Sequence, residues 1–182
     1  MIPILPDHNR LLFEILQKHA PHLDERAFGD HCDYTLDDYL TLAAAVSKES
    51  AGCDMLLQEI ERFISVIENP PTQGLQKIRN EDDVLAFYNA TNGLHDGEGA
   101  FVDLCGDTLR IGVVVTSIAG RPIAQMVFRG VKDWQFKRGY VFYSNIAFED
   151  GGVIWTEACR FDNELLKTSD YVRATSMEWV IQ

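Results

Sequence analysis

The densest group of potentially reactive side chains follows an Asn-Gly pair near the middle of the chain. His95, Asp96 and Glu98 stand among glycines at positions 93, 97 and 99, and Cys105 follows six residues after the last of them. A histidine beside carboxylates suits general acid–base catalysis, and a thiol activated by an imidazole suits nucleophilic catalysis. The glycine-rich loop 92–107 is therefore a candidate site, with these four residues as the candidate catalytic groups of a small hydrolase or transferase.

The same residues also fit an acidic turn with no chemistry, because Gly, Asn and Asp collect in loops for backbone reasons. The chain has no P-loop, no dinucleotide-binding glycine pattern, no G-x-S-x-G and no H-E-x-x-H, and the stretch does not match the register of an EF-hand. Its cysteines, Cys32, Cys53, Cys105 and Cys159, form no C-x-x-C pair. We therefore expect free thiols, no metal and no cofactor, and a non-enzymatic function is the preferred interpretation.

Charge gives the clearer functional signal. The net charge is −12, and residues 1–109 contain 20 acidic and 7 basic side chains, whereas residues 110–182 contain 8 and 9. A field of this sign repels nucleic-acid backbones and anionic membrane surfaces, but it attracts and steers a basic protein. The sequence thus predicts a basic protein as the partner, with no nucleic acid and no membrane.

The candidate partner-binding residues are acidic and stand at expected helix starts or in loops. They are Asp33, Asp37, Asp38, Glu81, Asp82, Asp83, Asp96 and Glu98. Their alternative role is helix capping and solubility, because acidic side chains are favoured in the first turn of any helix.

Apolar residues at helical spacing predict the elements that position these groups. Four amphipathic helices are expected, from about 7 to 20, 35 to 46, 56 to 67 and 80 to 92. Thr35 with Asp38 forms a capping box in which Asp replaces Glu, and Asn80 caps the fourth helix before Asn92 and Gly93 end it.

After Gly99 the pattern changes to β-rich runs. Strands are expected at 109–118, 122–128, 140–148, 153–161 and 171–181, and the acidic Gly-Gly segment 149–152 predicts a hairpin. Helices followed by strands indicate an α+β fold in which the N-terminal helices pack on one face of a C-terminal, mainly antiparallel sheet. We expect a single domain over 1–182, with a helical part from about 1 to 92 and a sheet part from about 100 to 182.

The start of the chain bears on its location. No basic segment followed by an apolar core and a small-residue cleavage site occurs in the first thirty residues, and no apolar run reaches the roughly 18 residues that span a bilayer. The sequence therefore predicts a soluble, cytoplasmic protein.

Two short stretches resemble the SUKH superfamily, many of whose bacterial members are immunity proteins that neutralise toxins of rival cells. Residues 87–94, Phe-Tyr-Asn-Ala-Thr-Asn-Gly-Leu, are similar to the helix-to-sheet junction of that family, and residues 146–152, Ile-Ala-Phe-Glu-Asp-Gly-Gly, to its glycine-containing hairpin. The resemblance covers about fifteen of the 182 residues. It implies protein binding, with a toxin as the basic partner, and it assigns no catalytic residues.

Overall fold

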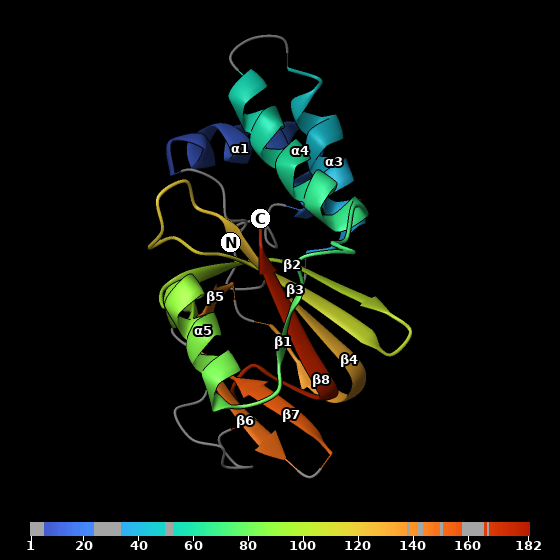
Figure 1. Ribbon diagram of the computed structural model, residues 1–182. Coiled ribbons are helices and arrows are strands. Elements are labelled where there is room, and N and C mark those ends of the chain that lie inside the picture. Colours follow the sequence, from blue (N-terminus) through green and yellow to red (C-terminus); the bar gives the residue numbers. More distant parts are fainter. Residues whose placement is uncertain are drawn as a thin grey trace.

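The computed structural model describes residues 6–23, 34–49, 53–137, 139–141, 144–149, 151–157, 166 and 168–182. The helical elements are α1 (Pro6–His19), η1 (Pro21–Leu23), α3 (Leu36–Val46), α4 (Asp54–Glu68), α5 (Glu81–Thr91) and η2 (Asn92–Leu94). The strands are β1 (Gln76–Ile78), β2 (Gly97–Cys105), β3 (Thr108–Val114), β4 (Ile123–Gln135), β5 (Tyr140–Val141), β6 (Asn145–Glu149), β7 (Gly152–Thr156) and β8 (Tyr171–Ile181). Figure 1 shows this arrangement.

The helices begin and end where local chemistry predicts. The Thr35 hydroxyl accepts a hydrogen bond from the backbone N–H of Asp38, and the Asp38 carboxylate accepts one from the backbone N–H of Thr35, which confirms the capping box of α3. The Asn80 side chain caps α5, and Asn92 ends that helix in the left-handed conformation. No helix within the described residues is long and apolar enough to cross a membrane.

The sheet is antiparallel at every pairing that the structure describes. Its strand order is β5-β2-β3-β4-β8-β7-β6, and the short β1 pairs with the C-terminal half of β8. Register shifts between Gly99 and Phe101 in β2, and between Val131 and Asp133 in β4, are sites where an extra residue bends the sheet. The expected α+β class with an antiparallel sheet is confirmed.

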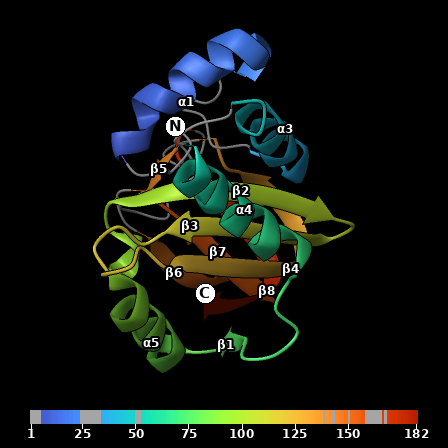
Figure 2. The same cartoon turned by 90° about the horizontal axis from the view of Figure 1, so that it is seen from above.

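The helices meet the sheet in two places. Helix α4 lies over β2 and β3, and α3 and α1 continue the N-terminal helical layer beyond the β2 side of α4 (Figure 2). Arg110 points to this layer, because its guanidinium donates to the carbonyl of Ile67 at the end of α4. Ile111, the next residue, faces the opposite side. Met126 of β4 pairs with Ile111 on one side and with Trp179 on the other, so Trp179 lies on the same face as Ile111. The ring of Phe87 in α5 lies 5.4 Å from the ring of Trp179. Thus α5 packs on the face opposite to α4.

Three strand predictions need correction. The run 140–148 is not one strand, because Tyr140–Val141 pairs with β2 at one end of the sheet and Asn145–Glu149 pairs with β7 at the other. β2 begins at Gly97, inside the segment expected to be a loop up to 107, and β1 lies in the helical half of the chain. The predicted hairpin is confirmed, since β6 and β7 pair up to Glu149 and Gly152.

Candidate functional site

The acidic start of α3 divides into one exposed and one buried carboxylate. Asp37 is exposed. Asp38 is only 8% exposed, and one of its oxygens accepts from both the backbone N–H and the hydroxyl of Thr35 at 2.8 Å. The expectation that Asp38 lies on an exposed surface is therefore wrong, because the capping box turns its carboxylate back onto the helix start. Asp33 lies outside the described residues.

The start of α5 shows the same division. Glu81 and Asp82 are exposed. The Asp83 carboxylate accepts from the Arg79 guanidinium at 3.1 Å and from the Arg79 backbone N–H at 2.9 Å. The Arg79 side chain is the main reason that the pKa of Asp83 is lowered from its usual value. The Asp83 carboxylate is thus bound to Arg79 at the start of α5. Glu81 and Asp82 are the exposed carboxylates of this turn.

The loop at 92–96 has an unusual backbone. Asn92, Leu94 and Asp96 have φ values of 53°, 57° and 57°, in the left-handed region that side chains rarely adopt. Leu94 is fully buried, and Ser144 donates to the carbonyl of Gly93 from both its backbone N–H and its hydroxyl. The buried Leu94 and the two hydrogen bonds from Ser144 therefore hold the loop in this conformation.

Both carboxylates of this loop region have partners. The Nδ1 atom of His95 lies 3.0 Å from the Asp96 carboxylate, with the two side chains 61% and 51% exposed. The Tyr140 hydroxyl also donates to Asp96, which is the main cause of a raised Tyr140 pKa. Glu98 forms an ion pair with Arg121, with 2.5 Å between Oε2 and Nη2. Asp96 and Glu98 therefore hold the loop to β5 and to the β3–β4 turn.

The four residues of the enzyme interpretation do not converge on one point. Glu98 lies opposite Val114 near the start of β2, whereas Cys105 lies opposite Thr108 at its end. Seven residues of extended strand separate them by about 23 Å. His95 and Asp96 form an open surface pair, and the part of the chain that the structure describes holds no group of three His, Cys, Asp or Glu residues placed to bind a metal ion.

The structure describes two of the four cysteines. Cys53 is buried, Cys105 is exposed, and neither forms a disulfide. Cys32 and Cys159 lie outside the described residues.

Sequence reasoning missed an acidic row on α4. Asp54, Glu61 and Glu68 recur every seven residues, so they lie along one side of the helix about 10 Å apart. All three are exposed, and none forms an ion pair within the described residues. We call these three residues the α4 stripe. The seven-residue spacing of these acidic residues is visible in the sequence, but the buried residues Leu56 and Phe63 of the same helix have the same spacing.

The exposed carboxylates of α3 and α4 thus lie on a different surface from those at the start of α5. Asp37 and the α4 stripe belong to the N-terminal helical layer, whereas Glu81 and Asp82 start α5 on the opposite face of the sheet (Figure 1). A flat partner surface can contact either group but not both.

Protein-family models, curated proteins and solved structures give no match to this chain.

Proposed function

We propose that this protein is a non-enzymatic binding protein whose acidic helical face docks a basic protein. The α4 stripe is the observation that carries the proposal. Its three carboxylates have no neutralising partner in the described part of the chain, and they follow one side of a helix for about 21 Å. A row of this length matches the dimensions of a protein interface and exceeds those of a small-ligand site.

Helix stability does not explain the stripe. Acidic residues favour the first turn of a helix, where Asp54 stands, but Glu68 stands in the last turn, where the helix dipole disfavours a negative charge. No basic residue occurs in that last turn, and the Arg110 guanidinium that donates to the carbonyl of Ile67 there is already paired with Asp103. Docking of a cationic surface gives all three carboxylates a favourable partner.

The resemblance to the SUKH superfamily suggests the kind of partner. Immunity proteins bind and neutralise a cognate toxin, and a basic toxin would be steered to an acidic helical face. We propose such a toxin as the partner, with a basic protein of another kind as the alternative.

The experiment compares two charge-neutralised proteins that have the same net charge. One carries Asp54→Asn, Glu61→Gln and Glu68→Gln, and its matched control carries Glu81→Gln, Asp82→Asn and Asp107→Asn. All six residues are exposed, so both variants should fold. The partner is captured from cells that make this chain, and association rates are measured at two ionic strengths.

We expect the stripe variant to associate roughly three to ten times more slowly at low salt, with a smaller difference at high salt. The control should change the rate much less, because Glu81 and Asp82 start α5 on the opposite face of the sheet and Asp107 lies in the turn between β2 and β3, outside the α4 stripe. An acidic partner, or equal slowing in the two variants, would contradict the proposal.

A further inference from the structure

The structure holds a pocket between the N-terminal helices and the sheet that the proposed function does not use. The pocket has a volume of about 450 Å³ and lies between α1, α4 and the turn that joins β3 to β4. It is lined by His8, Met55, Gln58, Glu59, Arg62, Phe63, Val114, Gly120 and Arg121. This volume lies within the range of pockets that take small organic ligands.

The apolar part of the pocket combines a rigid and an adaptable element. Phe63 is only 1% exposed, and its ring stacks on Tyr39 at 5.2 Å, which fixes its position. Val114 on β3 is also buried. Met55 is 65% exposed, and its flexible thioether side chain can close over a bound apolar group.

The charged lining is dominated by guanidinium groups. The Nη2 atom of Arg62 donates to the backbone carbonyl of Arg121 at 2.9 Å, and Arg62 forms no ion pair within the described residues. The Arg121 guanidinium forms an ion pair with the Glu98 carboxylate. The one carboxylate in the lining, Glu59, lies 3.0 Å from the Nδ1 atom of His8. Arg62 is therefore the lining group whose charge is not matched by a protein carboxylate.

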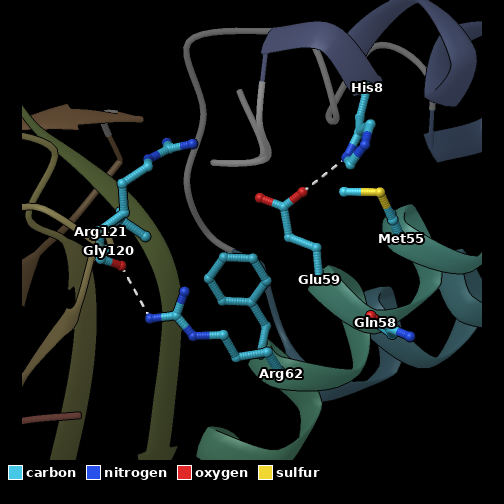
Figure 3. A pocket seen from close by; sticks show the side chains of 9 residues that line it. His8, Met55, Gln58, Glu59, Arg62, Gly120 and Arg121 are labelled. Atoms are coloured by element: carbon cyan, nitrogen blue, oxygen red, sulfur yellow. Dashed lines mark hydrogen bonds and ion pairs between the residues drawn. The ribbon is translucent and has the colours of Figure 1, made fainter.

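Figure 3 shows how these groups are arranged. The side chains of Arg121 and Glu59 extend toward the same space from the sheet side and the helix side, and His8 reaches Glu59 from α1. The turn that carries Arg121 has a fixed and unusual backbone, with φ values of 83° at Gly120 and 48° at Arg121. In this conformation the backbone carbonyl of Arg121 accepts from Arg62, and the guanidinium of Arg121 donates to Glu98. The guanidinium groups of Arg62 and Arg121 are therefore positioned before a ligand binds.

We propose that this pocket binds a small organic carboxylate, with its apolar body over Phe63 and Val114 and its carboxylate on the Arg62 guanidinium. A guanidinium recognises a carboxylate through charge-assisted hydrogen bonds, and Arg62 keeps most of its five donors for that contact. Apolar ligands without an anionic group fill the same space but lose this contact.

Two fluorescent probes that share the same apolar body test the proposal. Dansylglycine carries a carboxylate and dansylamide does not, and each gains fluorescence in an apolar site. Titrations use the full-length protein, the Arg62→Gln variant and the control Lys132→Gln. Lys132 is exposed and has no ion pair within the described residues. It lies nine residues beyond the start of β4, which places it roughly 30 Å from the pocket. Lys132→Gln therefore changes the net charge by the same amount as Arg62→Gln, but far from the pocket.

We expect saturable binding of dansylglycine that is about tenfold tighter than that of dansylamide. Arg62→Gln should remove this difference without changing dansylamide binding, and Arg62→Lys should restore part of it. Lys132→Gln should leave both affinities unchanged. Met55→Trp, which places a large side chain at the exposed wall, should weaken both probes.

Four results would overturn the inference: equal affinity for the two probes, no saturable binding of either probe, a dansylglycine affinity that Arg62→Gln does not change, or normal binding of both probes by Met55→Trp. A Met55→Trp variant that binds both probes normally would place their binding elsewhere on the molecule.

Discussion

Replacement of Gly112 by alanine tests the packing of the Phe101 ring across the β2–β3 pair. Gly112 lies in β3 directly opposite Phe101 of β2, on the face that meets α4. A Cβ atom at position 112 would fall 2.1 to 2.7 Å from three atoms of the Phe101 ring. The ring of Phe101 therefore occupies the space where a side chain at 112 would begin.

The expected size of the effect follows from these distances. Alanine in place of a strand glycine usually stabilises a protein by about 0.5–1 kcal/mol through backbone entropy. Carbon atoms in contact prefer a separation of about 3.5–4.0 Å, so the ring would have to move by more than about 1 Å. Phe101 is fully buried, and overpacking of this kind costs about 1–3 kcal/mol. We therefore expect Gly112→Ala to lower the free energy of unfolding.

Urea unfolding followed by circular dichroism measures this change, and a second background identifies its cause. In a Phe101→Leu background the shorter side chain leaves room at position 112, so Gly112→Ala should be neutral or stabilising there. A stabilising effect in the wild-type background would refute the steric argument. An equal loss of stability in both backgrounds would show that the ring is not the obstacle.

Three further outcomes are expected. Asp38→Ala should lower the free energy of unfolding by about 1–2 kcal/mol, because it removes a buried capping carboxylate, whereas Asp37→Ala should change it by less than about 0.5 kcal/mol, and urea unfolding compares the two. Asp96→Asn should lower the raised pKa of Tyr140 toward its ordinary value, which an ultraviolet titration of the phenolate with a Tyr140→Phe reference detects. Gln125→Met should raise the free energy of unfolding by about 1–3 kcal/mol, because both amide atoms of this fully buried side chain have no hydrogen-bond partner within the described residues; a loss of stability would disprove that account.

Features set by neighbouring residues could be predicted from the sequence. The Thr35 capping box needs only a hydroxyl and a carboxylate three residues apart, and the end of α5 needs only Asn92 followed by glycine. The hairpin at 149–152 likewise depends on residues that are adjacent in the chain. Each of these interactions closes within a few residues, so no tertiary information is required.

Features set by distant residues could not be predicted in this way. The glycines at 97 and 99 indicate a loop, but they belong to β2, where Gly97 leaves room for the side chain of Val113 across the strand pair. The run 140–148 has a uniform β pattern, yet its two ends pair at opposite edges of the sheet. Alternation shows which side chains share a face, but it does not identify the neighbouring strand.

The two proposed sites place opposite charges on different sides of α4. Leu56 and Phe63 hold the helix to the protein core, Glu61 belongs to the side that carries the stripe, and Arg62 lies at the pocket. The net charge of −12 acts over long distances and therefore governs the encounter with a large charged partner. At physiological salt the field of an exposed charge decays over about 8 Å, so a small ligand in the pocket responds mainly to the groups that line it. The acidic composition of the whole chain is therefore compatible with a small carboxylate that binds beside Arg62.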